Sequence, residues 1–386
     1  MTFAQYGDYF YLYILLLTAI PAIVLGLMGK NIKYYGMIAT IFMIFLIVGM
    51  NVTMKLLVIF ILTEVILIKV YLHVRKKTDS VIVYRIFLLC STLPLIINKI
   101  SPHTKWGAIG FIGISYLSFR AIQMIIEIYD GAIKEVNILT MCYFILFFPT
   151  FSSGPIDRSR RFEEELNKNI SRSEYVNDYL IPGINKIIMG IGYKFVVAFL
   201  INTYWMSKIQ TDHFTIMSAL NYMYAYSLYL FFDFGGYSLF AVGTSYIFGI
   251  TAPDNFDKPF ISKDMKEFWT RWHISLSRWL GDYVFSRFVL SFMRKKKFKK
   301  RATAAHVAQM ITMLTMGFWH GITWYYIIYG VYQGAVLILT DIYQKKSKYY
   351  KSHKKEKWFQ GVQILLTFHI ACFGLLIFSG YFAMLK

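Results

Sequence analysis

Residues 9–29 read YFYLYILLLTAIPAIVLGLMG and residues 34–54 read YYGMIATIFMIFLIVGMNVTM, and neither stretch contains Asp, Glu, Lys or Arg. Residues 136–156 and 358–385 are equally free of formal charge. A helix needs about 20 apolar residues to cross the hydrocarbon core of a bilayer. Four such stretches in one chain predict an all-α integral membrane protein that crosses the bilayer several times.

The composition of the whole chain supports this prediction. Of 386 residues, 57% are hydrophobic and only 16% are charged, whereas a soluble domain has roughly 25% charged residues. The 34 Phe and 30 Tyr residues suit lipid-facing helices and the aromatic belts of membrane interfaces. We therefore expect residues 1–386 to form a single polytopic membrane domain rather than two or three soluble ones.

The formal net charge of +20 lies mainly between the apolar stretches. Residues 294–301 (RKKKFKKR) contain seven cations, and residues 345–357 contain seven lysines and one glutamate. Cationic loops next to membrane spans face the cytoplasm. This distribution disfavours nucleic acid binding, which would also use lysine and arginine clusters.

Further spans are predicted by hydropathy, for a total of about eleven transmembrane helices. Their approximate bounds are 56–74, 81–98, 106–126, 183–208, 214–232 and 234–250. Residues 302–340 are uncharged and long enough for two crossings. Since the N-terminal segment has no cation before Lys30, both the N-terminus and the C-terminus are predicted to be extracellular.

Two segments have the mixed composition of helices that lie in the membrane interface. Residues 154–181 contain Asp157, Arg158 and further charged residues, and Gly154-Pro155 is expected to open a helix with proline in its first turn. Residues 254–294 alternate tryptophans with basic residues. Both predict amphipathic or re-entrant helices, which are less typical of a simple channel.

His320 is the first candidate catalytic residue. It lies near the middle of the uncharged residues 302–340, between Gly317 and Gly321, which permit close backbone approach and a break in the helix. Ionisable residues at membrane depth are often functional, and imidazole transfers protons near neutral pH. A straight helix from Arg301 would rise about 28 Å and place His320 in the outer half of the bilayer. The alternative is a histidine that only packs against a neighbouring helix.

His273 is the second candidate, within FWTRWHISLSRW (residues 268–279). A belt of Trp and Arg at the membrane interface would explain this pattern without any catalytic role. His369 lies in the last span without a polar or glycine-rich context, and we interpret it as a packing residue. The three cysteines are far apart and show no CxxC spacing, so no metal or disulfide framework is predicted.

These segments resemble the membrane-bound O-acyltransferase (MBOAT) family, and more closely its D-alanyl transferase (DltB) branch. DNFDKPF (residues 254–260), followed by FWTRWHISLS (residues 268–277), resembles the first histidine region of the family. MGFWHG (residues 316–321) resembles the second region, where the family has its essential histidine. FSSGPIDR (residues 151–158) resembles the form usual in the D-alanyl transferase branch.

The resemblance implies an MBOAT-type bundle that transfers an acyl group from a thioester to a hydroxyl, with His320 as general base and His273 orienting the thioester or stabilising charge. No cofactor or metal bound by the chain is implied. The donor would be D-alanine on the phosphopantetheine arm of a small acidic cytoplasmic carrier protein. The acceptor would be teichoic acid or an intermediate acceptor protein. The other motif residues expected to bind substrate or shape its site are Trp319, Gly321, Trp272, Ser277, Ser153, Gly154, Pro155, Asp157 and Arg158.

A docking surface for this carrier is predicted just before the first basic cluster. Phe285, Phe288, Val289 and Phe292 recur at three- and four-residue spacing, and Lys295 and Lys296 follow them. Charge accelerates the encounter with an acidic partner, and apolar anchors hold it. In the alternative interpretation, the apolar residues pack on the bundle and the lysines contact anionic lipid.

Two other functions use the same features. A polysaccharide O-acetyltransferase of the same family would differ in its acyl donor. A membrane transporter or channel would use similar spans and buried histidines, but the motif spacing and the shortage of intramembrane carboxylates favour the enzyme.

Overall fold

The computed structural model describes residues 2–105, 107–211 and 213–385. Within these ranges the regular structure is helical, and one isolated β-bridge pairs Phe256 with Trp272. The chain forms two compact units, Met1–Ile191 with Tyr237–Pro253 and Gly192–Gly236 with Asp254–Lys386.

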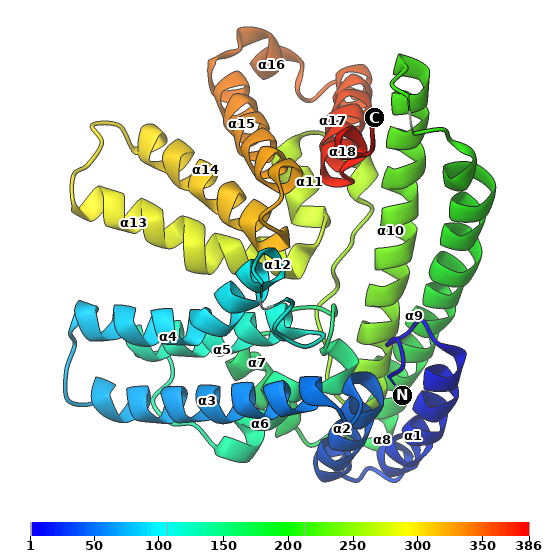
Figure 1. Ribbon diagram of the computed structural model, residues 1–386, viewed down its shortest axis with the longest axis vertical. Helices are drawn as coiled ribbons and strands as arrows, with labels where there is room; N and C mark the ends of the chain where they lie inside the picture. The colour runs from blue at the N-terminus through cyan, green and yellow to red at the C-terminus, as the bar shows by residue number, and fades with distance from the viewer. Residues whose placement is uncertain (1, 106, 212, 386) are drawn as a thin grey trace. The chain divides into compact units, whose positions relative to one another are not determined.

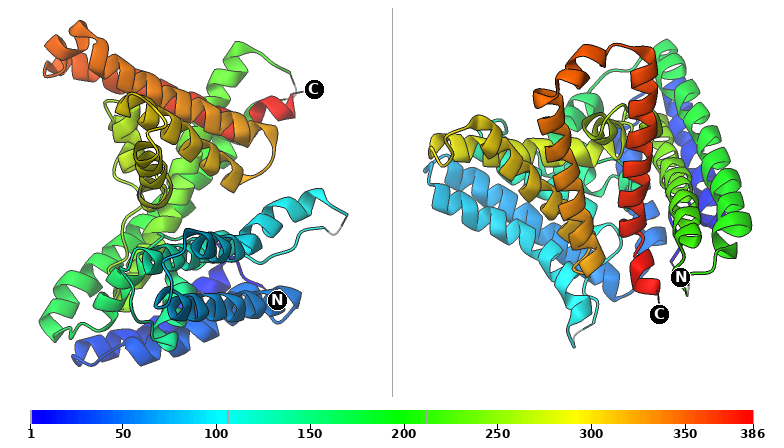
Figure 2. Two further views of the ribbon diagram at one scale, coloured as in Figure 1. Left: turned by 90° about the vertical axis from the view of Figure 1, so that its left-hand side faces the viewer. Right: turned by 90° about the horizontal axis from the view of Figure 1, so that it is seen from above.

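The first unit is built mainly from the helices of the N-terminal half. They are α1 (Tyr9–Leu27), α2 (Lys33–Val48), α3 (Val52–Arg75), α4 (Val81–Ile100), α5 (Ile114–Tyr129), α6 (Ile138–Leu146), α7 (Ser159–Leu166), α8 (Arg172–Glu174) and α9 (Ile181–Ile191). A π-helical turn, Tyr175–Leu180, joins α8 to α9. The helices α3, α4 and α5 pack side by side, as Figures 1 and 2 show in blue to cyan.

The second unit contains the C-terminal helices. They are α11 (Met265–Arg271), α12 (Ile274–Leu280), α13 (Ser286–Arg294), α14 (Arg301–His320), α15 (Trp324–Lys346), α16 (Lys348–His353), α17 (Lys357–Phe378) and α18 (Tyr381–Met384). The uncharged residues 302–340 fold back on themselves, and α14 packs along α15 (Figure 1). The predicted return of the chain within this stretch is confirmed, whereas of the two helices only α15 is long and apolar enough to be a candidate membrane span.

Helix α10 (Ile216–Ile247) is continuous over 32 residues and contributes to both units. The sequence predicted two spans here, 214–232 and 234–250, and that prediction is wrong. Gly235 and Gly236 remain helical, because a glycine inside a helix costs only about 1 kcal/mol relative to alanine. The carboxylate of Asp233 pairs with the ammonium of Lys194 at 2.5 Å, so the charge at this point also does not require a helix end.

Six helices in the described residues are long and apolar enough to cross a membrane. They lie in Tyr9–Leu27, Val52–Arg75, Val81–His103, Arg172–Lys208, Trp324–Lys346 and Lys357–Met384. Two shorter apolar helical segments, Lys33–Val48 and Ile138–Thr150, accompany them. The helical membrane fold is confirmed, whereas the predicted count of about eleven spans is not.

The predicted amphipathic segments are also helical, with one correction. Helix α7 is preceded by Arg158 in an extended conformation and begins at Ser159, four residues after Pro155. The prediction that Gly154-Pro155 opens the helix is therefore wrong. The carboxylate of Asp157 accepts the backbone N–H of Arg158 at 2.7 Å, and this contact fixes the chain in an extended turn before the helix starts.

Candidate active site

His320 is the last residue of α14, and its ring lies among aromatic side chains of the second unit. The ring centroids of Trp319 and Phe378 are 4.5 Å and 4.7 Å from that of His320. The rings of Tyr326 and Tyr329 follow at 5.8 Å and 6.4 Å. The imidazole is half-buried, so it packs against these aromatic rings and remains partly accessible.

Glycines set the close packing of α14 against α15 next to this histidine. A Cβ on Gly317 would lie 2.5 Å from the carbonyl oxygen of Tyr326, and a Cβ on Gly330 would lie 2.7 Å from that of Met313. A Cβ on Gly321 would meet the ring of Tyr326 at 2.7 Å. The helix ends at His320. The predicted close approach and helix break at Gly317 and Gly321 are thus confirmed.

His273 lies between α11 and α12 in the same unit and is only 4% exposed. Its backbone is left-handed, with φ of 46°, an uncommon conformation for a residue other than glycine. Its ring centroid lies 4.9 Å from that of Phe234 and 6.4 Å from that of Trp319. Trp319 therefore contacts both histidine rings.

Asn255 holds the turn that presents His273. Its backbone oxygen accepts the N–H of Ile274 at 2.9 Å, and its side-chain oxygen accepts the hydroxyl of Ser275 at 2.6 Å. On the other side, the hydroxyl of Ser277 donates to the backbone oxygen of Trp272 at 3.1 Å. The predicted motif residues Trp272 and Ser277 thus shape the turn around His273.

Burial lowers the pKa of His273, which lies outside the candidate membrane spans, to about 3. The cause is desolvation, which disfavours the charged imidazolium. At neutral pH this imidazole is neutral, with one nitrogen able to donate a hydrogen bond and the other able to accept one. Such a group can orient a polar substrate without adding a charge.

The third motif, residues 151–158, lies in the first unit and is held by internal hydrogen bonds. The hydroxyl of Ser152 lies 2.5 Å from that of Tyr237 and donates to the side-chain oxygen of Gln5 at 2.7 Å. The backbone N–H of Ser153 donates to the hydroxyl of Tyr237 at 3.3 Å. A Cβ on Gly154 would lie 2.5 Å from the Cα of Thr150, which explains the small residue there.

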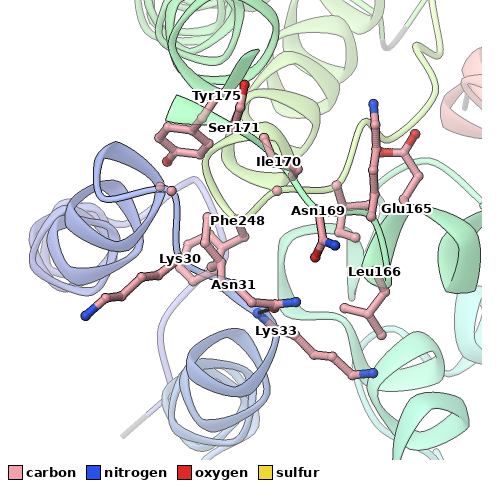
Figure 3. Close-up of a pocket in the computed structure, with 16 residues that line it drawn as sticks. Lys30, Asn31, Lys33, Glu165, Leu166, Asn169, Ile170, Ser171, Tyr175 and Phe248 are labelled. Carbon is pink, nitrogen blue, oxygen red and sulfur yellow. Dashed lines mark hydrogen bonds between the residues drawn. The ribbon is translucent and has the colours of Figure 1, made fainter. Parts of the chain in front are cut away.

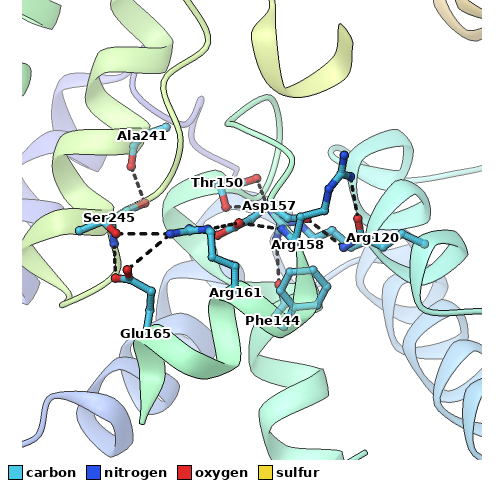
Figure 4. Close-up of polar contacts among 11 residues, drawn as sticks. Arg120, Phe144, Thr150, Asp157, Arg158, Arg161, Glu165, Ala241 and Ser245 are labelled. Carbon is cyan, nitrogen blue, oxygen red and sulfur yellow. Dashed lines mark hydrogen bonds and ion pairs between the residues drawn. The ribbon is translucent and has the colours of Figure 1, made fainter. Parts of the chain in front are cut away.

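Charged side chains brace the end of the same motif (Figure 4). Asp157 forms an ion pair with Arg161, and its backbone oxygen accepts the side-chain amide of Gln123 at 2.9 Å. The guanidinium of Arg158 donates to the other end of Gln123 at 3.1 Å. Asp157 and Arg158 therefore stabilise the local structure of the motif. Their role in binding substrate stays a prediction.

A cavity of about 340 Å³ opens beside the predicted motif in the second unit. Arg278 gives its lining positive charge, whereas the ammonium of Lys266 pairs with the carboxylate of Asp341 at 2.7 Å. Thr270, Ser277 and Gln309 give the lining hydrogen-bonding groups. Apolar side chains complete the wall: Trp269, Leu280, Phe285, Met313 and Leu337. The lining therefore combines positive charge, hydrogen-bonding groups and apolar surface.

The predicted docking residues lie on and after α13, next to this cavity. Val289 and Phe292 are half-buried, whereas Lys295 and Lys296 are exposed. The ring of Phe292 packs between those of Phe288 and Phe298, at 5.8 Å and 5.3 Å. Exposed apolar side chains of the same helix are Phe288, Leu290 and Met293.

Comparison with known proteins assigns the family. The sequence profile of the membrane-bound O-acyltransferase family matches residues 3–380. The chain belongs to the membrane-bound O-acyltransferase family. This protein is therefore a multi-pass membrane protein and an acyltransferase, and the alternative of a transporter is not supported.

Individual relatives of this membrane-bound O-acyltransferase are similar over almost the whole chain. It is 43% identical to the teichoic acid D-alanyltransferase of Bacillus subtilis, over 97% of this chain and 98% of that protein. It is 39% identical to the teichoic acid D-alanyltransferase of Streptococcus thermophilus, over 97% and 95%. A probable alginate O-acetylase of Pseudomonas syringae is 31% identical, over 70% of this chain and 49% of that protein.

Sequence reasoning missed several residues around the histidines. Phe234, Phe378 and Tyr326 contact the two histidine rings, and Asn255 holds the turn of His273. Asn255 was within a recognised motif and could have been found there, whereas Phe378 gave no signal beyond hydropathy. Among the described residues, no group of three or more His, Cys, Asp and Glu side chains could hold a metal ion.

Proposed function

We propose that this acyltransferase transfers D-alanine from the phosphopantetheine thioester of an acidic cytoplasmic carrier protein toward the hydroxyl groups of teichoic acid outside the cell. The main support is the similarity to two teichoic acid D-alanyltransferases over at least 97% of the chain. The immediate acceptor is a hydroxyl of teichoic acid or of an intermediate acceptor protein.

In this proposal His320 is the general base. The acceptor hydroxyl attacks the thioester carbonyl, a C–O bond forms, the C–S bond breaks, and the thiolate leaves. The imidazole of His320 takes the hydroxyl proton and returns it to the thiolate, so the step consumes no other reactant. The half-buried position of His320 among aromatic rings supports this role, because general-base catalysis requires an imidazole that the substrate can reach.

His273 has the supporting role in the same reaction. Its neutral imidazole, buried next to Trp319, would orient the thioester or donate a hydrogen bond to the developing oxyanion. Preorganised donors of this kind contribute strongly to acyl transfer. Its left-handed backbone costs conformational energy, and such strain often occurs at functional sites.

The cavity of about 340 Å³ beside α13 is our candidate for the phosphopantetheine arm. The cationic side chain of Arg278 matches the phosphate of the arm, and the polar and apolar side chains of the lining match its amides and methylenes. The exposed Lys295 and Lys296 would meet the acidic carrier at the cytoplasmic surface.

The orientation follows from the basic loops. The side chain of Arg75 donates to the backbone oxygen of Tyr129 at 3.1 and 3.2 Å, so the ends of α3 and α5 lie at the same end of the first unit. The loops after these helices contain Lys76, Lys77 and Lys134, which face the cytoplasm by the positive-inside rule. Both termini would then be extracellular.

The test is transfer of radiolabelled D-alanine from loaded carrier protein to membrane acceptors, at matched expression of each variant. We expect His320→Ala to lower transfer by roughly 100-fold or more, the scale of losing a general base. The matched control is His369→Ala, because His369 is exposed and its ring contacts the backbone oxygen of Leu365 in the same helix, at 2.7 Å. Unchanged transfer by His320→Ala would remove this residue from the mechanism.

The similarity to a probable alginate O-acetylase supports one alternative, O-acetylation of a polysaccharide. The two functions differ in their donor. If folded wild-type protein failed to transfer D-alanine from loaded carrier but transferred acetyl groups, the D-alanylation proposal would be wrong.

A further inference from the structure

A second pocket, of about 320 Å³, lies in the first unit between two loops. One side is the loop that joins α1 to α2, with Lys30, Asn31 and Lys33, and the other is the loop that follows α7, with Asn169 and Ser171. Figure 3 shows the two loops facing each other, with Phe248 between them. Neither the acyl-transfer motifs nor the predicted carrier surface uses these residues.

Local contacts fix the shape of the first loop. Gly29 has a positive φ of 64°, which lets the chain turn directly after α1. The side-chain oxygen of Asn31 accepts the N–H of Lys33, the first residue of α2, at 2.7 Å. The ammonium of Lys33 then donates to the side-chain oxygen of Asn167 at 2.9 Å, so the two loops are tied together across the pocket.

The floor of the pocket is apolar and rigid. Tyr175 is fully buried, and its hydroxyl donates to the backbone oxygen of Ile247 at 2.8 Å. Its ring packs so closely on α1 that a Cβ on Gly26 would lie 2.3 Å from it. Phe248 and Ile250 complete this floor. The floor of the pocket is therefore a preformed surface on which a ligand can bind.

The charge of the pocket is positive. Its lining contains three lysines, Lys30, Lys33 and Lys168, and the single carboxylate of Glu165. That carboxylate accepts the backbone N–H of Thr251 at 3.0 Å and pairs with a guanidinium of α7 at 3.6 Å.

The three lysines differ in whether a nearby carboxylate already neutralises their charge. Lys168 pairs with Glu174 at 2.6 Å. The hydrogen-bond partner of Lys33 is the neutral amide of Asn167, and Lys30 has no carboxylate within ion-pair distance among the residues that the structure describes. Lys30 in the α1–α2 loop and Lys33 at the start of α2 are thus available to an anion.

The position of the pocket indicates which class of anionic ligand it binds. It lies where the apolar helices α1 and α2 meet, and therefore at a water-facing boundary of the membrane. Next to it Met28 and Tyr34 are 59% and 70% exposed, and exposed Val24 and Ile38 continue the apolar surface along the two helices. Tyrosine at this depth is typical of the headgroup region. A ligand with both a phosphate and apolar chains matches the cationic pocket and the exposed apolar surface of α1 and α2.

We propose that this pocket binds the phosphate of an anionic membrane phospholipid, with its acyl chains along the exposed apolar side chains of α1 and α2. Lys30 and Lys33 supply the positive charge, and Asn169 and Ser171 supply hydrogen-bonding groups. Basic residues at the membrane surface gain about 1 kcal/mol each from anionic lipid. The bound lipid stabilises the contact between the α1–α2 loop and the α7–α8 loop.

The experiment measures lipid binding to the full-length protein in neutral detergent, by native mass spectrometry and by the shift in melting temperature. The probes are phosphatidylglycerol, phosphatidylcholine and inorganic phosphate. We expect phosphatidylglycerol to bind and to raise the melting temperature, and phosphatidylcholine to do so at least tenfold more weakly. The variant Lys30→Gln/Lys33→Gln is expected to weaken phosphatidylglycerol binding about tenfold or more, as two charge contacts predict.

Two controls separate the proposed site from other effects. Lys354→Gln/Lys355→Gln removes two exposed lysines elsewhere and should leave the lipid affinity unchanged. Asn167→Ala removes the hydrogen bond of Lys33 but keeps both charges, so it should retain lipid binding even if it lowers stability. The single variant Lys30→Gln serves if the double variant does not fold, because Lys30 is exposed.

Equal affinity of wild type and Lys30→Gln/Lys33→Gln for phosphatidylglycerol would overturn the proposal, as would equal binding of phosphatidylcholine. Stabilisation by inorganic phosphate without binding of phosphatidylglycerol would overturn the lipid as the occupant of the pocket.

Discussion

The ring of His273 lies 6.4 Å from the ring of Trp319, nearly parallel to it at 29°, and Trp319 directly precedes His320 in the chain. The ring of Trp319 is also 4.5 Å from that of His320. One tryptophan therefore contacts both histidines, which come from two separate motifs about fifty residues apart in the sequence. From this arrangement we predict that Trp319 positions the proposed general base.

Replacing Trp319 should change the rate of transfer more than the binding of the donor. We expect Trp319→Ala to lower kcat at least tenfold with little change in the KM for loaded carrier, because His320 loses the ring that fixes its orientation. Trp319→Phe retains an aromatic surface and should recover part of the rate. Steady-state transfer assays on both variants measure this; equal kcat for wild type and Trp319→Ala would refute a positioning role.

The buried His273 should make the protein sensitive to acid. Its pKa in the folded state is about 3, below the usual 6.5 or so of the unfolded chain. As the pH falls below about 6.5, His273 therefore takes up a proton in the unfolded state while it stays neutral in the folded state. This proton uptake favours unfolding, so the folded protein loses stability progressively as the pH falls toward 3. At pH 5 this loss is about 2 kcal/mol.

His273→Asn tests this pH dependence, because asparagine tolerates the left-handed backbone at this position. The variant should lose less stability than wild type when the pH is lowered from 7.5 to 5, as measured by thermal unfolding in detergent. His306→Asn provides a comparison, since His306 is less buried and pairs with Asp341 at 2.8 Å. Parallel pH curves for wild type and His273→Asn would contradict the assignment of this titration.

The sequence predicted the α14–α15 hairpin and the histidine at its bend for clear physical reasons. Residues 302–340 lack charge, so hydropathy identifies them as membrane-embedded, and their length requires a return. The glycines at 317 and 321 indicate a close approach and a break, and the structure has both. Local patterns of this kind are visible in a sequence because they involve neighbours along the chain.

The features that the sequence did not predict depend on contacts between distant residues. Hydropathy separated α10 into two spans at Asp233, because it does not register the ion pair between Asp233 and Lys194. Phe378 reaches the ring of His320 from the last long helix, and no periodic pattern indicates that contact. In residues 151–158 the motif was recognised, but its hydrogen bonds to Gln5 and Tyr237 become visible only in three dimensions.

Glycine packing between α14 and α15 should be essential for stability near the site. Gly330→Ala places a Cβ 2.7 Å from the carbonyl oxygen of Met313, a contact that rigid backbone does not relieve. Overpacking of this kind costs roughly 1–3 kcal/mol, so the melting temperature should fall. Gly361→Ala in α17 is the matched control, since no atom lies within 4 Å of its Cβ. A melting temperature for Gly330→Ala as high as that of Gly361→Ala would show that the helices separate easily.

Charge reversal after α13 should weaken docking of the proposed acidic carrier without affecting the fold. Lys295 and Lys296 are exposed, so Lys295→Glu/Lys296→Glu removes no buried contact. Because opposite charges mainly speed association, we expect the KM for loaded carrier to rise about tenfold or more, with kcat nearly unchanged at saturation. Adding salt should weaken wild-type binding and reduce the difference between the two proteins.

The apolar part of the same docking surface is tested with a different substitution, because some of its residues are half-buried. Phe292 packs between two other rings, so its replacement would disturb α13 itself, whereas Met293 is 42% exposed. Met293→Asp therefore tests an apolar carrier contact, and Lys354→Glu/Lys355→Glu, which changes two exposed lysines of the other basic cluster, controls for general charge effects. If this control raised the KM as much as Lys295→Glu/Lys296→Glu did, the carrier would be attracted by overall charge, and the proposed docking surface after α13 would be wrong.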